Sequence, residues 1–205
     1  MKKSMLIAAL AALALSATVA RADNMDGSSG LYLGAYGGYD WSSADTGVAG
    51  VSPDVDGFDG GLFVGYKLHS LLDHVNHLGI GLNAALQASY GWSNADGSAG
   101  GVLFEKESEW GVSLRPGFDV LDAATSSVGI SPYAILGYRN TKFEATALGI
   151  TASERYDGFE LGLGAELMAH KNIGVRLEYT HTWYGSEGGV DPDSDDLRAG
   201  VAFHF

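Results

Sequence analysis

The stretch that decides the fold is Leu197-Arg198-Ala199-Gly200-Val201-Ala202-Phe203-His204-Phe205, which ends the 205-residue chain. An apolar side chain stands at every second position, and the residues between are small or charged. Side chains of a β-strand point alternately to its two faces, so this stretch predicts a strand with one continuous apolar face. Arg198 and His204 belong to the opposite face.

The same alternation recurs in seven further segments, which predicts an all-β chain of eight strands. In one of them Leu161, Leu163 and Leu167 alternate with Glu160 and Glu166. The predicted strands cover residues 30–41, 57–67, 77–93, 108–121, 128–140, 156–169, 172–184 and 195–205.

Two features indicate which face of these strands points inward. A soluble barrel encloses its apolar face, whereas a membrane barrel turns that face toward lipid. The polar face here is rich in Gly, Ala and Ser, which leave room for Arg and Glu side chains inside a narrow barrel. Threading the strands up and down also sorts the aromatic residues into two belts, as the two interfaces of a membrane require. One belt holds Tyr39, Trp41, Tyr90, Trp92, Trp110, Tyr138, Phe159, Tyr179 and Trp183, and the other holds Tyr66, Phe118, Phe203 and Phe205.

Long and short connections alternate along the chain. Residues 42–56, 94–107, 141–155 and 185–194 are long, polar and rich in Gly, Asp and Ser, while residues 68–76, 122–127 and 170–171 are shorter. Four loops therefore lie at one end of the predicted structure, and three turns and both chain ends lie at the other. The sequence predicts an eight-stranded antiparallel up-and-down transmembrane β-barrel.

The N-terminal segment predicts export. Lys2 and Lys3 precede an apolar run from Met5 to Leu15 that is too short to span a bilayer, and residues 20–22 form a small-x-small cleavage site. We expect a signal peptide over residues 1–22, cleaved near Ala22, a linker over 23–29 and one barrel domain over 30–205. The expected mature chain keeps 9 basic residues against 25 acidic ones, a net charge of −16 that disfavours nucleic-acid partners. The lack of Cys excludes disulfides and thiol chemistry, and no cofactor is expected.

Several of the predicted strands contain glycine-rich and aromatic motifs besides the closing stretch. They are Leu31-Tyr32-Leu33-Gly34, Gly60-Gly61-Leu62-Phe63-Val64-Gly65-Tyr66, Ser131-Pro132-Tyr133-Ala134, Gly158-Phe159-Glu160-Leu161-Gly162-Leu163-Gly164 and Val175-Arg176-Leu177-Glu178-Tyr179. Together these motifs resemble the small outer-membrane β-barrel family, which includes OmpA-like barrels, opacity-type surface proteins and porin-like surface antigens. The resemblance covers nearly all of residues 30–205. It implies the outer membrane of a Gram-negative cell, contact with outer-membrane lipid and lipopolysaccharide, and a signal for the barrel-assembly machinery at Phe203 and Phe205.

Charged residues of the inward parity would face one another across a narrow lumen. Buried charges must pair, and an eight-stranded barrel is only just wide enough for its side chains. We expect a structural salt-bridge network that plugs the lumen, with a selectivity constriction as the alternative. The residues are Asp59, Lys67, Arg115, Arg139, Glu160, Glu166, Arg176, Glu178, Arg198 and His204.

The acidic fourth loop is a candidate metal site. Asp191, Asp193 and Asp195 could place oxygens around a divalent cation, but the EF-hand pattern is absent and a solvated acidic loop is favoured. The first short turn carries a second candidate, His69, His74 and His77, where interfacial histidines are favoured over a metal site.

No catalytic residues are predicted. His181 lies at the outer rim, as in lipid A-modifying barrels, but Trp183 stands where such a site would need Ser, and Glu178 has the opposite parity. The sequence predicts a non-enzymatic surface protein that displays four acidic loops to an envelope or host partner. A narrow channel for small solutes is the first alternative, and a lipid A-modifying enzyme is the second.

Overall fold

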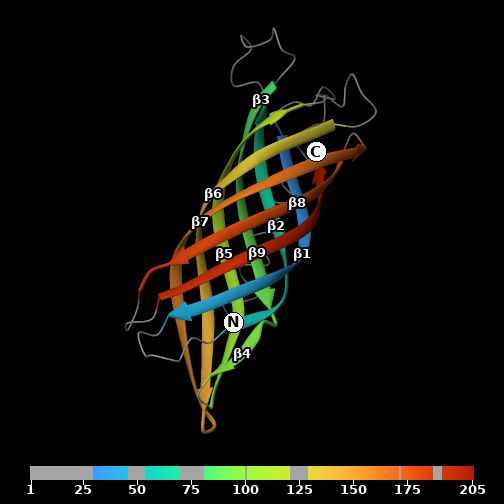
Figure 1. The fold of residues 1–205 in the computed structure, drawn as a ribbon. Helices are drawn as coiled ribbons and strands as arrows, with labels where there is room; N and C mark the ends of the chain where they lie inside the picture. Colours follow the sequence, from blue (N-terminus) through green and yellow to red (C-terminus); the bar gives the residue numbers. More distant parts are fainter. Residues whose placement is uncertain are drawn as a thin grey trace.

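The computed structural model describes residues 30–45, 54–69, 81–99, 101–120, 129–170, 172–186 and 191–205 (Figure 1). The expected signal peptide and linker lie outside these ranges. None of the described residues belongs to a helix long and apolar enough to cross a membrane. The described chain is all β, as the alternation predicts.

The described residues form one antiparallel sheet whose long strands close into an eight-stranded barrel. Consecutive barrel strands pair with one another, and β1 pairs with β9, so the closed barrel has no sheet edge. The short strand β4 lies outside this ring and pairs mainly with β5. The strands are β1 (Gly30–Asp45), β2 (Asp54–His69), β3 (Gly81–Ser93), β4 (Asp96–Ala99), β5 (Val102–Asp119), β6 (Gly129–Ala147), β7 (Ile150–His170), β8 (Ile173–Tyr184) and β9 (Asp191–His204).

The C-terminal stretch closes the barrel. The register of β1 and β9 runs from Tyr32 opposite His204 to Asp45 opposite Asp191. The backbone N–H of Phe205 donates a hydrogen bond to the Leu31 carbonyl at 3.0 Å. The ladder between the first and last strands therefore extends to the final residue.

The four predicted long loops are shorter than expected because strands continue into them. Residues 141–155 are not a loop: β6 and β7 run through them as a hairpin that turns at Leu148 and Gly149. Residues 94–107 hold β4 and the start of β5, β1 reaches Asp45, and β9 already begins at Asp191. A strand that extends beyond a membrane needs no apolar face, so the alternation fades although backbone pairing continues.

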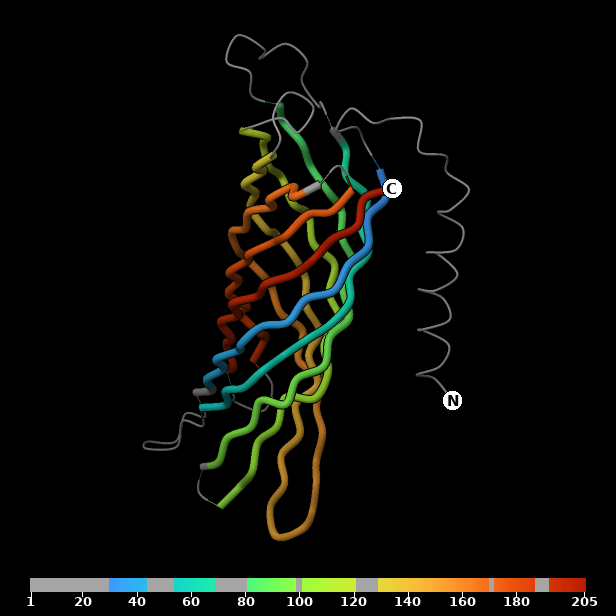
Figure 2. The backbone as a smooth tube through the Cα atoms, turned by 90° about the vertical axis from the view of Figure 1, so that its right-hand side faces the viewer, coloured from blue at the N-terminus to red at the C-terminus, as the bar shows by residue number. Residues whose placement is uncertain are grey.

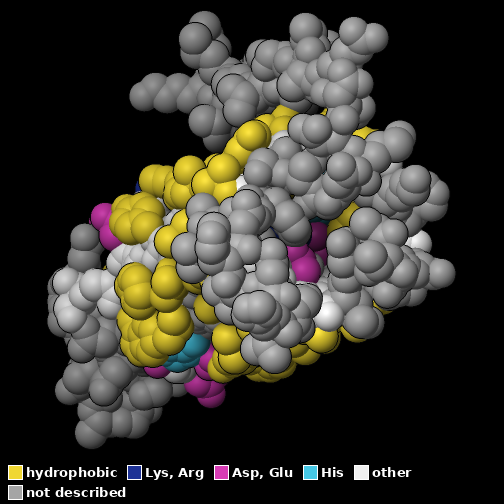
Figure 3. Space-filling view, turned by 90° about the horizontal axis from the view of Figure 1, so that it is seen from above, with side chains coloured by type: hydrophobic (Ala, Val, Ile, Leu, Met, Phe, Trp, Pro, Cys, Tyr) yellow, Lys and Arg dark blue, Asp and Glu magenta, His cyan; other side chains and the backbone are white. Residues whose placement is uncertain are grey.

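The apolar parity faces outward and the charged parity faces inward, the reverse of a soluble barrel. Leu163 is 69% exposed and Val201 is 53% exposed, whereas Arg139 and Glu166 are each 3% exposed. Figure 3, seen from the side of the C-terminus, shows hydrophobic side chains around the visible outer wall. A continuous apolar wall of this kind is what a lipid-facing barrel requires.

The two ends of the barrel differ (Figure 2). The terminal end holds Gly30 and Phe205. The hairpin end holds the β4–β5 and β6–β7 hairpins, which project beyond the other strands in Figure 2. Phe143 lies between Tyr156 and Tyr184 where the longer hairpin leaves the barrel, with ring centroids 5.7 and 5.8 Å apart. These rings pack the projecting strands onto the barrel.

Candidate functional site

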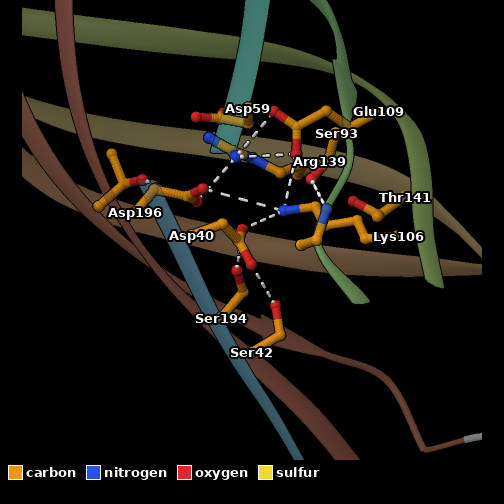
Figure 4. Close-up of polar contacts among 12 residues, drawn as sticks. Asp40, Ser42, Asp59, Ser93, Lys106, Glu109, Arg139, Thr141, Ser194 and Asp196 are labelled. Atoms are coloured by element: carbon orange, nitrogen blue, oxygen red, sulfur yellow. Dashed lines mark hydrogen bonds and ion pairs between the residues drawn. The ribbon is translucent and has the colours of Figure 1, made fainter. Parts of the chain in front are cut away.

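Charged side chains from six strands meet inside the barrel near the hairpin end, and Figure 4 labels most of them. Arg139 lies among three carboxylates: its Nε donates to Glu160 at 2.7 Å, and its Nη1 donates to Glu109 at 3.1 Å and to Asp196 at 3.0 Å. We call this group the hairpin-end cluster; it comprises Asp40, Asp59, Lys106, Glu109, Arg139, Glu160, Asp196 and Arg198.

Two further cations join the same carboxylates. Arg198 Nη2 lies 2.5 Å from Glu109, 2.7 Å from Asp59 and 3.0 Å from Asp196. The Lys106 ammonium donates to Asp40, lies 3.1 Å from Glu109 and is fully buried. Each cation therefore contacts more than one carboxylate, which makes the hairpin-end cluster a network rather than a set of isolated pairs.

A second charged group lies nearer the terminal end. Arg115 pairs with Glu178, with 3.1 Å between Nη2 and Oε2, and Tyr133 donates to the same carboxylate at 2.5 Å. Arg176 pairs with Glu166 and lies over the Tyr32 ring, 4.5 Å from its centroid. We call this group the terminal-end cluster; it comprises Lys67, Arg115, Asp119, Glu166, Arg176, Glu178 and His204.

Glycine on the inner wall makes room for these side chains. A Cβ on Gly38 would lie 2.6 Å from Asp59 Oδ1 and 2.7 Å from Arg198 Cγ. A Cβ on Gly65 would lie 2.3 Å from the Tyr32 ring. Larger residues at these positions would displace the charged and aromatic side chains, which explains the many glycines on the polar parity.

A small cavity, of about 20 Å³, lies between the two clusters and is lined in part by Tyr36, Phe63, Gln87 and Ser113. Such a volume holds about one water molecule.

All the predicted inward-facing charges do point inward, and the structure divides them between the two clusters. Sequence reasoning missed four members of the hairpin-end cluster: Asp40, Lys106, Glu109 and Asp196. Asp40 and Glu109 have the inward parity of their predicted strands, so parity could have identified both as lumen residues. Asp196 likewise has the inward parity of its predicted strand, 195–205, whereas Lys106 was placed in a loop and only the extension of β5 turns it into the lumen.

The predicted aromatic belt at the hairpin end lies on the outer wall. Trp110 packs on Tyr138 at 5.5 Å between ring centroids, and Phe159 stacks on Trp183 at 6.2 Å. Phe58, absent from the predicted belt, is 68% exposed and packs on Tyr39 at 5.2 Å. Of the other predicted belt residues, Trp41, Tyr66, Trp92 and Tyr179 are exposed and Tyr90 is half-buried.

The acidic residues proposed as metal ligands lie on β9 rather than in a loop. Asp193 accepts a hydrogen bond from Ser43 at 2.6 Å, and Asp195 accepts one from Tyr179 at 2.6 Å. The side chain of Asp191 lies outside the described residues, as do those of His69, His74 and His77. Within the described ranges, no three His, Asp or Glu side chains are arranged to hold a metal ion.

Asp195 also contacts His181, a pair that the sequence did not indicate. His181 Nδ1 lies 2.8 Å from Asp195 Oδ1, and its ring packs on Trp183 at 4.3 Å between centroids. The pair faces outward at the hairpin-end belt. Trp183 supplies an indole where a hydrolase of this type would need a hydroxyl nucleophile.

The projecting hairpins carry their own charged contacts outside the barrel. Lys142 donates to Glu107 and, at 2.5 Å, to Glu144. The hydrogen bond to Glu107, followed by that to Glu144, raises the pKa of Lys142 above its ordinary value. These contacts join β5 to β6 on the outer face.

Comparisons with known proteins agree with this architecture. A family model described as the outer membrane protein beta-barrel domain matches residues 6–205. The crystal structure of Neisserial surface protein A is similar, with 17% identity, a TM-score of 0.53, and coverage of 85% of this chain and 97% of that one. Ail, the attachment invasion locus protein of Yersinia pestis, is 17% identical with a TM-score of 0.44, covering 85% of this chain and 99% of Ail. The N-terminal barrel of Pseudomonas aeruginosa OprF is 16% identical with a TM-score of 0.46, covering 83% and 97%.

No curated protein matches the sequence significantly. At these identities the likeness to solved structures concerns the fold alone.

Proposed function

The chain belongs to the outer membrane protein β-barrel family, and on that premise we propose that it is a non-enzymatic surface protein whose plugged barrel displays the hairpin end outside the cell. Membership places the protein in the Gram-negative outer membrane. The observation that carries the proposal is the contrast between the two parts of the molecule. Buried ion pairs cross the barrel interior, while β5, β6 and β7 extend well beyond the aromatic belt.

The plug is supported by the geometry of the hairpin-end cluster. Arg139, Lys106 and Arg198 each bridge carboxylates from different strands, so opening a pore would separate several buried charge pairs at once. A barrel of this size offers little space in which to move them. We infer that its lumen carries no solute.

The outer wall supports the remaining partners. The exposed aromatic belts are positioned for outer-membrane lipid and lipopolysaccharide, and Phe205 ends the closing strand where the barrel-assembly machinery would bind it. An envelope or host protein would meet the hairpin end. Many of the acidic residues that the sequence placed in loops lie on the extended strands of the hairpin end.

Single-channel recording in planar bilayers tests the plug. The purified protein should give no stable conductance steps above background. Reproducible steps would favour the alternative of a narrow channel for small solutes.

Cysteine labelling on whole cells tests the orientation, because the chain contains no native Cys. Leu148→Cys, at the hairpin end, should react with a membrane-impermeant maleimide on intact cells. Val120→Cys, which is also exposed but lies at the terminal end, should react only after the outer membrane is permeabilised. The reverse pattern would place the hairpins in the periplasm and contradict the proposal.

A further inference from the structure

The projecting part of β7 has a free edge. Its residues 150–157 pair with β6 throughout, whereas the pairing of β7 with β8 begins only at Gly158. Thr151, Ser153 and Arg155 are exposed, and no other strand of the described residues lies beside them. An unpaired strand edge is a ready template for another strand.

The turn of the hairpin defines which backbone groups point to that edge. Leu148 and Gly149 both have positive φ, 50° and 80°, as in a two-residue turn of type I′. In such a hairpin the flanking residues Ala147 and Ile150 exchange backbone hydrogen bonds, and hydrogen-bonded pairs then recur at every second position. The amides and carbonyls of Ala152, Glu154 and Tyr156 therefore point toward β6.

The backbone amides and carbonyls of Thr151, Ser153 and Arg155 consequently point away from β6. An independent contact supports this alternation: the Gly185 N–H donates to the Asp157 carbonyl at 2.8 Å, and Asp157 has the same parity as Ser153. The free edge thus presents backbone donors and acceptors from three alternate residues.

The edge carries the charged residues Glu154, Arg155 and Asp157, but it lacks several other features that usually prevent strand addition. Residues 150–157 contain no Pro and no Lys, and the pairing of β6 with β7 has no bulge. Natural proteins commonly use such features to protect exposed edges. Small side chains at Ala152 and Ser153 leave the backbone accessible.

The tip beside this edge is apolar and strained. Leu148 is fully exposed and Ile150 is 75% exposed. Leu148 has a φ of 50°, a region that favours Gly or Asn, yet the turn reads Leu-Gly rather than Asn-Gly. Strain together with exposed apolar surface is disfavoured unless it serves an interaction.

We propose that the free edge of β7 binds an extended segment of a partner polypeptide, which adds as a further strand beside residues 151–155. Backbone hydrogen bonds would supply affinity, and side chains of alternate residues would supply selectivity. Glu154 and Arg155 lie on opposite faces, so an antiparallel partner strand fits best with an acidic residue opposite Arg155 followed by a basic residue opposite Glu154. The apolar tip would contact the residues that follow. This inference rests on the proposed function, because the hairpin end must face outward to meet such a partner.

The test uses the full-length protein in detergent micelles and a designed peptide. The probe is fluorescein-labelled Thr-Glu-Lys-Thr-Val-Thr-Val, blocked at its C-terminus, and binding is followed by fluorescence anisotropy. A matched control peptide carries N-methyl groups on Glu and on the second and third Thr, the residues whose amides would face β7. The control should bind at least tenfold more weakly, and equal binding of the two peptides would overturn the proposal.

Two substitutions at one position separate the edge from the rest of the hairpin. Ser153→Pro removes an amide that points to the free edge and leaves the pairing with β6 intact, so probe affinity should fall at least tenfold. Ser153→Ala should bind like the wild type. Undiminished binding by Ser153→Pro would show that the probe does not occupy this edge.

Amide hydrogen exchange gives a readout that does not depend on the probe. In the free protein, Thr151, Ser153 and Arg155 should exchange at least tenfold faster than Ala152 and Glu154, and saturating probe should slow them. Slow exchange in the free protein would mean that another part of the chain already covers the edge. Dimers in analytical ultracentrifugation that Ser153→Pro abolishes would assign the edge to a second copy and overturn the heterologous partner.

Failure here is distinguishable from failure of the proposed function. If Leu148→Cys is labelled on intact cells but the probe does not bind, the surface protein stands and strand addition is wrong.

Discussion

Replacing Arg139 by Met tests whether the hairpin-end cluster is a desolvated plug. The Arg139 side chain is only 4% exposed, so water screens its ion pairs little. Arg139→Met keeps the bulk but removes a charge that contacts Glu160, Glu109 and Asp196. A buried hydrogen bond to a charged group contributes about 1.5–3 kcal/mol, so three of them set an upper range of about 4.5–9 kcal/mol.

The expected loss is smaller because two of the three carboxylates keep other partners. Glu109 and Asp196 remain in contact with Arg198 and Lys106. Glu160 loses its cation, because the contacts of the described residues pair it with Arg139 alone. Removing one partner of a buried ion pair typically costs about 3–5 kcal/mol, and we expect the free energy of unfolding to fall by that amount.

The assay is equilibrium urea unfolding in phospholipid vesicles, followed by fluorescence of the belt tryptophans. The double variant Arg139→Met with Glu160→Met removes both charges of one pair and should recover most of the loss, to within about 1 kcal/mol of wild type. Arg155→Met, on the exposed part of β7, should leave stability unchanged. If Arg139→Met folds and differs from wild type by less than about 1 kcal/mol, the cluster is screened by water. That result would refute the plug and favour a hydrated lumen.

Three further outcomes are expected. Leu163→Arg places a charge on the lipid-facing wall and should lower the free energy of unfolding by about 2–4 kcal/mol in the same assay. Leu163→Ala should lower it much less. An arginine variant as stable as the wild type would show that Leu163 does not face lipid. The contacts of Lys142 with Glu107 and Glu144 raise its pKa, so the stability that they contribute is complete below the ordinary pKa of 10.5 and is lost as pH rises through the higher pKa of the folded state. Amide exchange in β6 should therefore accelerate only in strongly alkaline solution. An acceleration near neutral pH would count against these contacts. Mass spectrometry of lipid A from cells with wild-type protein and with His181→Ala should give identical acylation, and a missing or added acyl chain tied to His181 would revive the enzyme alternative.

Strand facing could be predicted wherever a strand crosses the membrane. Leu163 and Glu160 separate by parity because lipid on one side and a narrow lumen on the other impose opposite demands at every second residue. The same constraint ends at the aromatic belt. Beyond it, Lys142 and Glu144 lie on the part of β6 that the alternation did not identify, since a hairpin in water is held by backbone pairing with no apolar face to mark it.

The sequence predicted that the lumen holds a network of charged residues, but it identified only some of the residues in that network. Arg139 and Arg198 were found from their inward parity alone. Their shared contact with Asp196 was not, because parity places a side chain in the lumen without specifying which side chains meet there. The His181–Asp195 pair likewise needs the register between β8 and β9, which local patterns do not specify.

By itself the sequence determined the class of fold, the direction of its faces and the closing role of the C-terminal strand, because a two-residue period and a lipid environment leave one arrangement of apolar and charged sides. Only the tertiary structure decided which charges meet across the lumen, and that among the described residues the first part of β7 has no neighbour on the side away from β6. Those features depend on strand register and strand length beyond the membrane. Both are set by backbone hydrogen bonds between residues distant in the chain, such as Gly38 opposite Arg198 and Gly158 opposite Tyr184.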